Sequence, residues 1–261
     1  MVVKNDLHVS IIQTAIYWES PIANRAEIEE QIAEIKGKTD LILLPEMFTT
    51  GFSSNAVELA EPMNFTTHKW MKQMANQYNA AVCGSIIIKE NNQFFNRLLF
   101  IIPSGETSYY DKKHLFGYGG EDKLFSPGEK KLIVKYLGWN ICPLICYDLR
   151  FPVFSRNIDL SYDVLIYSAS WPASRINVWN TLLPARAIEN QSYVIGVNRI
   201  GTDGNSIKHN GLSQCIDPKG YLINTPENKQ SIITVQLSKN DLDLFRQKFP
   251  AYLDADPFDL K

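Results

Sequence analysis

The chain has 261 residues, 45% of them hydrophobic, and a formal net charge of −2. This composition predicts a globular domain with a substantial core, and it excludes the strongly basic surface that nucleic-acid-binding proteins use. The sequence has no run of about 18 apolar residues, so we expect no membrane-spanning helix. No basic region followed by an apolar run lies near the first residue, so we expect no secretory signal.

The cysteines are sparse, and most of them lie in apolar, strand-like segments. They are Cys83, Cys142, Cys146 and Cys215. This usage is typical of a reducing compartment, and we expect the protein in the cytoplasm. Cys142 and Cys146 form a C-x-x-x-C pair, but no second Cys/His pair has the spacing of a zinc site, so we predict no metal.

Apolar strands alternate with amphipathic helices along the first part of the chain. The periodicity predicts strands at 7–14, 40–44, 81–88, 97–102 and 107–111, and helices at 21–35 and 66–78. Glu46 stands just past the strand at 40–44, after Pro45. Because ligands bind beyond the carboxyl ends of strands in open α/β sheets, Glu46 is a candidate general base, although an ordinary loop charge is the alternative.

A pair of lysines follows the strand-like stretch 107–111. Successive strand side chains alternate between faces, so one of Lys112 and Lys113 points inward and the other outward, unless both belong to a solvated strand end. The Gly-rich segment 117–120 indicates a mobile loop. Glu121 lies just beyond it and is either a site residue or a loop charge.

Cys146 ends an apolar strand at 140–146, and polar residues follow at once. This pattern indicates a buried strand that ends in a sharp turn, with a helix soon after. Backbone N–H groups and the helix dipole at such a position favour a thiolate, which a cysteine nucleophile needs. Taken alone, the segment favours a buried cysteine that only fills the core.

The second part of the chain repeats the alternation of strands and helices. Further strands are predicted at 131–136, 164–168, 193–198, 211–216 and 232–237, and helices at 152–160, 178–190 and 241–248. Pro184 predicts a kink or a late start in the helix at 178–190. Ser238 with Asp241 resembles a capping box at the start of the last helix.

Many strands with helices on their outer faces predict an α/β fold of stacked sheets covered by helices. The sequence shows no internal repeat, linker or low-complexity stretch, so we predict a single domain, 1–261. The tail from about 249 has no clear periodicity and indicates an extended arm, packed on its own subunit or on a partner.

Three segments together resemble the nitrilase, or carbon–nitrogen hydrolase, superfamily. They are a Glu after an apolar strand, a Lys in a K-x-H-L-F run and a Cys in C-Y-D-x-R-F-P, in that order. The S-P-G turn at 126–128 and the A-R-A-I-E-N run at 185–190 are similar to further motifs of the family. The resemblance covers nearly the whole chain and implies an α-β-β-α sandwich, a homodimer and catalysis without a cofactor.

The resemblance also implies a role for each site residue. Cys146 would be the nucleophile, Glu46 the general base and Lys112 the oxyanion stabiliser, helped by a backbone N–H near Tyr147. Lys112 is chosen over Lys113 because the family lysine stands two residues before the histidine. Glu121 matches a second family glutamate, which orients the lysine or the substrate amide.

Within the superfamily, the chain most resembles the omega-amidases, which hydrolyse the terminal amide of 2-oxoglutaramate and 2-oxosuccinamate. Arg150 matches an arginine that binds the distal carboxylate of the substrate, for which a guanidinium is suited; the alternative is a buried salt bridge with Asp148. We expect Trp171 to wall the pocket, and Arg175 to add a second carboxylate contact or merely to cap solvent. The segment 170–175 departs from the T-G-P-x-x-W form of animal-type omega-amidases.

Other functions stay open at this point. One alternative is an amidase for N-carbamoyl compounds or neutral aliphatic amides, and another is a non-catalytic scaffold on the same fold. A true nitrilase usually has its cysteine in a C-W-E context, which this chain lacks. The histidines His8, His68 and His209 have no ligand spacing, and we expect them at the surface, whereas His114 is expected to be a satisfied interior residue.

Overall fold

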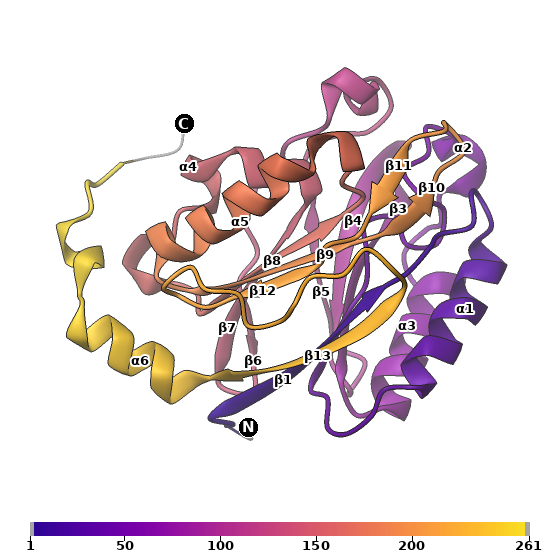
Figure 1. Cartoon of the computed structure of the whole chain (residues 1–261). Helices are drawn as coiled ribbons and strands as arrows, with labels where there is room; N and C mark the ends of the chain where they lie inside the picture. The colour runs from indigo at the N-terminus through magenta and orange to yellow at the C-terminus, as the bar shows by residue number, and fades with distance from the viewer. Residues whose placement is uncertain (1–2, 259–261) are drawn as a thin grey trace.

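Two β-sheets stacked on one another form the centre of the protein (Figure 1), whose computed structural model describes residues 3–258. The first sheet has the order β13-β1-β2-β3-β4-β5, and the second has the order β12-β9-β8-β7-β6. The strands of the first sheet are β1 (Asp6–Gln13), β2 (Leu41–Leu43), β3 (Ala81–Glu90), β4 (Gln93–Ile101), β5 (Thr107–Asp111) and β13 (Ser231–Ser238). Those of the second are β6 (Val134–Tyr136), β7 (Trp139–Ile145), β8 (Val164–Ala169), β9 (Tyr193–Asn198) and β12 (Gln214–Ile216).

Both sheets are parallel at their centres and antiparallel at their edges. Strand β2 runs parallel to β1 and β3, and β8 runs parallel to β7 and β9. A separate hairpin of β10 (Ile200–Thr202) and β11 (Lys208–Asn210) follows β9. Because parallel strands end at the same edge of a sheet, the loops after β2, β7 and β8 are candidates for a common site.

Helices cover the outer face of each sheet (Figure 1), which confirms the predicted α-β-β-α sandwich. The helices α1 (Pro21–Ala33) and α3 (Thr66–Gln77) pack on the first sheet, and α5 (Ile176–Asn190) packs on the second. The remaining helices are α2 (Ala56–Leu59), α4 (Pro152–Ser155) and α6 (Lys239–Lys248). In the described part of the chain, no helix is both long enough and apolar enough to cross a lipid bilayer.

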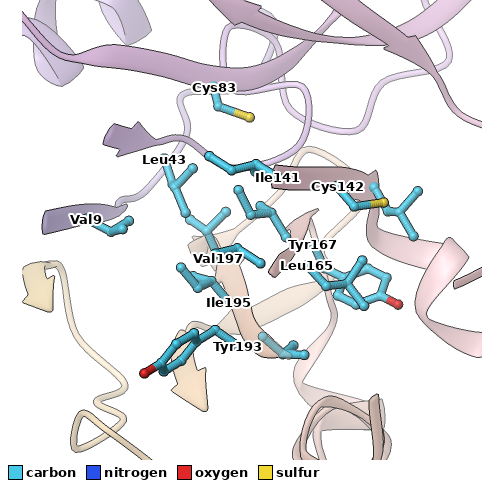
Figure 2. Close-up of a cluster of buried hydrophobic side chains, with 14 of the residues drawn as sticks. Val9, Leu43, Cys83, Ile141, Cys142, Leu165, Tyr167, Tyr193, Ile195 and Val197 are labelled. Carbon is cyan, nitrogen blue, oxygen red and sulfur yellow. The ribbon is translucent and has the colours of Figure 1, made fainter. Parts of the chain in front are cut away.

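Alternating side chains of the first sheet build two different cores. Val9 and Leu43 face the second sheet and meet Ile195 and its neighbours, as Figure 2 shows. The adjacent residue Ile42 points to the other face and packs beneath α1 and α3. A shift of one residue in strand register would exchange these faces, so burial on both sides specifies the register.

The prediction of one continuous helix at 152–160 is wrong. The helix α4 stops at Ser155, and a short 3₁₀ helix, η4 (Ile158–Leu160), follows. The side chain of Asn157 occupies the break, where it donates to the carbonyl oxygens of Tyr162 and Asn190 at 2.9 and 3.0 Å. These bonds offer the chain an alternative to helical pairing, which the hydrophobic periodicity did not reveal.

Two other predicted boundaries differ from the structure. The strand expected at 211–216 is confined to β12, because Gly211 and Leu212 have φ angles of 64° and 55°, outside the range of a strand. The helix α5 starts two residues before the predicted 178 and continues through Pro184.

The C-terminal segment is tied to the second sheet by one buried arginine. Arg246 on α6 donates to Asp163 Oδ1 at 2.9 Å, to the Tyr162 carbonyl at 2.8 Å and to the Gln191 carbonyl at 2.9 Å. Beyond α6, the side-chain amide of Gln191 donates to the carbonyl of Phe249 at 2.7 Å. The rest of the arm to residue 258 is largely exposed and extends from the body of the protein (Figure 1).

We predict that Arg246→Met lowers the free energy of unfolding by about 3 kcal/mol, because it leaves the Gln191 carbonyl unpaired, takes one of two donors from the Tyr162 carbonyl and removes the buried ion pair with Asp163. Chemical denaturation measures the change. Lys248→Met on the exposed side of the same helix is the matched control and should stay within about 0.5 kcal/mol of the wild type. A loss below about 1 kcal/mol for Arg246→Met would show that α6 docks without this arginine.

Candidate active site

A cavity of about 310 Å³ lies beyond the carboxyl ends of the central strands. Glu46 follows β2, Cys146 follows β7 and Ser170 follows β8, so both sheets contribute to the cavity. The structure brings all eight predicted site residues to its wall. These residues are Glu46, Lys112, Glu121, Cys146, Tyr147, Arg150, Trp171 and Arg175.

Cys146 stands on a sharp turn between β7 and the 3₁₀ helix η3 (Cys146–Arg150), with a φ of 40°. A left-handed conformation is uncommon for a residue with a side chain and persists only where the surroundings enforce it. Buried Asp148 supplies that constraint. Its carboxylate accepts from the backbone N–H of Ile145 at 3.0 Å, from Tyr110 Oη at 2.8 Å and from the backbone N–H of His114 at 3.1 Å.

A buried ammonium lies between two buried carboxylates. Lys112 Nζ donates to Glu46 Oε1 at 2.8 Å and to Glu121 Oε2 at 2.8 Å. The second oxygen of Glu46 accepts from the backbone N–H of Ser170 at 3.0 Å, and Glu121 Oε2 also accepts from the backbone N–H of Phe116 at 2.6 Å. The carboxylates therefore have fixed orientations, and charge-assisted bonds hold them.

The local field sets the protonation states of the cluster. Burial alone lowers the pKa of Lys112, but the negative charges of Glu121 and Glu46 outweigh it and raise this pKa, so the side chain stays an ammonium. Burial raises the pKa of Glu121, and the charge of Lys112 opposes that rise. Lys112 is therefore a fixed positive charge in the cavity wall.

The surroundings of Cys146 favour the protonated thiol, contrary to the thiolate-favouring environment expected from the sequence. Burial raises its pKa well above 9.0, and the negative charge of Glu46 raises it further, against the opposing effect of Lys112. The helix η3 is only five residues long, so it offers little dipole to offset these effects. Glu46 and Cys146 line the same cavity, and the charge of Glu46 acts directly on the thiol.

The S-P-G turn holds the backbone on which Lys112 stands. The N–H of Gly128 donates to the Lys112 carbonyl at 2.9 Å, and a Cβ at Gly128 would lie 2.1 Å from the carbonyl oxygen of Asp111. Only glycine permits this approach. Lys112 is 1% exposed and lines the cavity, whereas Lys113 does not line it in the described structure.

The Gly-rich segment predicted as a loop has a defined conformation. Residues Gly117–Gly119 form the 3₁₀ helix η1, and Glu121–Lys123 form a second one, η2. Gly120 joins them with a φ of 76°, a left-handed conformation that glycine adopts without strain. This turn points Glu121 back into the cavity, and the mobility of the segment stays a prediction.

Two arginines, Arg150 and Arg175, also line the cavity. Arg150 Cζ lies 5.4 Å from the ring centroid of Trp171, and Arg175 Cζ lies 5.2 Å from that of Phe116. Among residues 3–258, neither arginine has a carboxylate within salt-bridge distance. The alternative of an Arg150–Asp148 salt bridge is wrong, because the ion-pair partner of Asp148 is His114, at 2.8 Å.

Aromatic side chains shape the remaining wall. Tyr147 packs edge-on against Phe116 and Phe151, with centroids 5.0 and 5.2 Å apart. Trp171 is buried over Trp179, which donates from Nε1 to the Leu212 carbonyl and does not itself line the cavity in the part of the chain described.

The expectation that His68 and His209 lie at the surface is wrong. His68 is buried and accepts at Nδ1 from the backbone N–H of Asn64, at 3.0 Å. His209 lines the cavity from β11 and lies 3.2 Å from the Trp171 carbonyl and 3.3 Å from Asp203 Oδ2. Burial lowers the pKa of His209, and Asp203 opposes this effect. No local pattern marked the burial of His209, since the Trp171 carbonyl that it contacts lies 38 positions away along the chain.

Sequence reasoning also missed two polar residues that support the cluster. Ser170 donates its backbone N–H to the Glu46 carboxylate and its hydroxyl to the Glu46 carbonyl, at 3.0 and 3.2 Å. Asn96, on β4, bonds to both buried glutamates. An asparagine within an apolar strand was the available signal for Asn96. Within the described residues, no group of three or more His, Cys, Asp or Glu side chains is arranged to hold a metal ion.

Comparisons with known proteins agree with this geometry. The family model for carbon–nitrogen hydrolases matches residues 8–247. Omega-amidase YafV of Escherichia coli (strain K12) is 42% identical over 97% of this chain and 98% of its own length. The 2-oxoglutaramate amidase of Bacillus subtilis (strain 168) is 30% identical over 94% and 96%. The crystal structure of XC1258 from Xanthomonas campestris, a CN-hydrolase superfamily protein with an arsenic adduct in the active site, has a TM-score of 0.96 and 40% identity, covering 99% of this chain and 100% of its own.

We predict that Cys146 forms little thiolate below pH 9.0, its ordinary pKa, because burial and the charge of Glu46 favour the neutral thiol. The ultraviolet absorbance of thiolate, titrated against pH and corrected with a Cys146→Ser variant, measures this. Glu46→Gln removes the nearby negative charge, so the titration should move to lower pH while amide turnover falls. Thiolate already present at neutral pH in the wild type would contradict the prediction.

Proposed function

The chain belongs to the carbon–nitrogen hydrolase family, and we propose that it is an omega-amidase, which hydrolyses the terminal amide of small omega-amido 2-oxo acids. 2-Oxoglutaramate and 2-oxosuccinamate are the proposed substrates, and the products are the dicarboxylate and ammonia. One observation carries the proposal: a cysteine, a carboxylate and an ammonium line one cavity together with two arginines that have no acidic partner among the described residues.

The reaction would begin with attack by Cys146 on the amide carbonyl. As the S–C bond forms, Glu46 takes the thiol proton and the carbonyl π electrons move to oxygen. Glu46 lines the cavity with Cys146 and its charge raises the pKa of the thiol, which supports a base that takes the proton during the attack, with no prior ionisation of the thiol. The base therefore acts in the same step as the attack.

Lys112 and the backbone N–H of Tyr147 would then stabilise the tetrahedral oxyanion. Glu46 returns its proton to the nitrogen, the C–N bond breaks, and ammonia leaves behind a thioester on Cys146. Water, deprotonated by Glu46, attacks the thioester, and the thiol is regenerated as the acid product leaves. Glu121 would hold Lys112 in place, which its bonds to Nζ at 2.8 and 3.1 Å support. No step needs a cofactor.

The two arginines would select a substrate that carries a carboxylate. Arg150 and Arg175 each stack on an aromatic ring, so the fork of N–H donors is held in place while its polar edge stays free for a carboxylate. Trp171 would form the apolar side of the pocket along the carbon chain of the substrate. A cationic substrate would meet two positive charges there, which disfavours an N-carbamoyl compound with a basic tail.

Physical arguments disfavour two alternatives, a neutral aliphatic amide as substrate and a non-catalytic scaffold. A neutral aliphatic amide would leave both guanidiniums without a charged partner, which favours an acidic substrate over it. A non-catalytic scaffold would have no need to bury three ionised groups around an accessible cysteine, since burying charges is costly. Both alternatives are outcomes of the experiment below.

Ammonia release tests the proposal directly. The purified protein is assayed side by side with 2-oxoglutaramate, glutamine, an N-carbamoyl amine and a simple nitrile, with Cys146→Ala as the blank. The proposal requires that 2-oxoglutaramate has the highest kcat/KM of the four compounds and that the Cys146→Ala blank releases no ammonia above background. A higher kcat/KM for the N-carbamoyl amine or for a neutral amide would show that the proposed substrate is wrong. If no compound is hydrolysed, the non-catalytic scaffold becomes the better interpretation.

We predict that Arg150→Met raises KM for 2-oxoglutaramate about ten- to a hundredfold, because a charge-assisted contact contributes about 1.5–3 kcal/mol and 1.36 kcal/mol is tenfold. A neutral amide of similar length should change much less. Arg156→Met is the matched control, since Arg156 donates to the Glu189 carbonyl and does not line the cavity in the described structure. Equal losses for both amides would make Arg150 a structural residue.

We also propose that the protein is a cytoplasmic homodimer. Exposed apolar side chains on α4, η4, α5 and the segments near the C-terminal arm support a second copy as partner; they include Val153, Ile158, Ile188, Tyr221, Leu222 and Leu253. The four free cysteines support a reducing compartment. We expect light scattering to give twice the mass of the chain at micromolar concentration, and a fully active monomer would refute the dimer.

A further inference from the structure

We propose that Asn96 is a positioning residue for the acid–base cluster: its side-chain amide joins Glu46 and Glu121 and fixes both carboxylates around Lys112. The inference rests on the roles proposed above for those three residues, but it does not depend on which amide is the substrate. No family motif identified in the sequence includes Asn96, which occupies the fourth position of β4.

The contacts form a closed ring of two oxygens and two nitrogens. Asn96 Nδ2 donates to Glu46 Oε1 at 2.9 Å and to Glu121 Oε1 at 3.0 Å. Lys112 Nζ donates to the same two oxygens at 2.8 and 3.1 Å. Each oxygen therefore lies between an amide N–H and an ammonium N–H, which holds two like charges side by side.

The orientation of the Asn96 amide follows from these acceptors. If the amide were rotated by half a turn, its carbonyl oxygen would face two carboxylate oxygens and no donor. In the orientation present, Oδ1 is buried without a hydrogen-bond partner in the described structure, which is costly for a polar atom. An apolar side chain of the same shape would avoid that cost, so the two N–H donors explain why an amide occupies this position.

The main chain of Asn96 contributes to the same arrangement. Its carbonyl accepts the backbone N–H of Lys112 at 3.0 Å, so one residue holds the lysine backbone and both carboxylates. Asn96 is completely buried and lies outside the set of described residues that line the cavity. It therefore acts on the reaction only through the groups that it holds.

The consequence for Glu46 concerns which oxygen serves as the base. Oε1 already accepts from Asn96 and from Lys112, and Oε2 accepts only the backbone N–H of Ser170, at 3.0 Å, among the described hydrogen bonds. The fixed carboxylate thus presents Oε2 to the thiol of Cys146. Without the Asn96 donor, the carboxylate of Glu46 can rotate, and Lys112 alone bridges Glu46 and Glu121.

A neutral double donor suits this position better than other side chains of similar size. Aspartate would add a third carboxylate to two that share one ammonium, and leucine would leave the pair with Lys112 alone. Burial already raises the pKa of Glu121 despite the neighbouring ammonium, so the cluster depends on every donor to its ionised form. The amide adds two N–H donors without adding charge.

The test separates turnover from binding. Asn96→Leu and Asn96→Asp, both close to asparagine in shape, are assayed for kcat with the best amide of the substrate panel. Each should lower kcat about ten- to a hundredfold, the loss typical of one hydrogen bond to a charged group. The inhibition constant of the acid product of that amide should stay within about threefold of the wild type, because the variants leave every described residue that lines the cavity in place.

Asn157→Asp is the matched control. Asn157 is also buried, and its amide also bridges two acceptors, the carbonyls of Tyr162 and Asn190, but away from the cavity. This variant should unfold at a lower temperature and keep the kcat of the folded enzyme. If Asn96→Leu proves too unstable to assay, Asn96→Asp alone carries the comparison, since it preserves the volume of the side chain.

Two results would overturn the inference. Wild-type kcat in either folded Asn96 variant would show that the amide donors are dispensable, and equal losses in kcat and product affinity would show a general collapse of the pocket. The proposed substrate is tested separately from this inference. If the substrate is wrong, the wild-type enzyme itself does not hydrolyse 2-oxoglutaramate. If the inference is wrong, the wild-type enzyme is active and the Asn96 variants are as active as it is.

Discussion

The buried ammonium of Lys112, shared between Glu46 and Glu121, is the interaction on which the rest of the site depends. Two carboxylates and one ammonium leave a net negative charge in a buried place, and such a group needs further donors. The backbone N–H groups of Ser170 and Phe116 and the amide of Asn96 supply them. These donors come from both sheets and from the turn after β5, so the site exists only when the sandwich is assembled.

The same charge balance explains the state of the cysteine. Burial and the negative charge of Glu46 beside Cys146 keep its thiol protonated. In the proposed mechanism, thiolate formation is therefore coupled to attack instead of preceding it. A neutral thiol is also a poorer target for oxidation than a thiolate, because reactivity follows thiolate character. Lys112 is then free to respond to charge that develops on the substrate oxygen.

Asp148 has a comparable role on the backbone. It forms no direct bond to Cys146 among the described contacts, yet its bonds to Ile145, Tyr110 and His114 hold the turn on which the thiol stands in a left-handed conformation. The geometry of the nucleophile is therefore set by a residue two positions along the chain, and the aromatic wall around Arg150 is left free to meet a substrate.

By itself, the sequence determined the strands, the layered fold and the identity of the residues at the strand ends, Glu46, Lys112 and Cys146, because hydrophobic periodicity and motif spacing are local properties. Only the tertiary structure decided their partners. Asn96 reaches Glu46 across 50 positions, and Ser170 reaches it across 124, so no local pattern marks either contact. The protonation of Cys146 was decided in the same way, since electrostatic effects depend on distances in the folded chain and not on order along it.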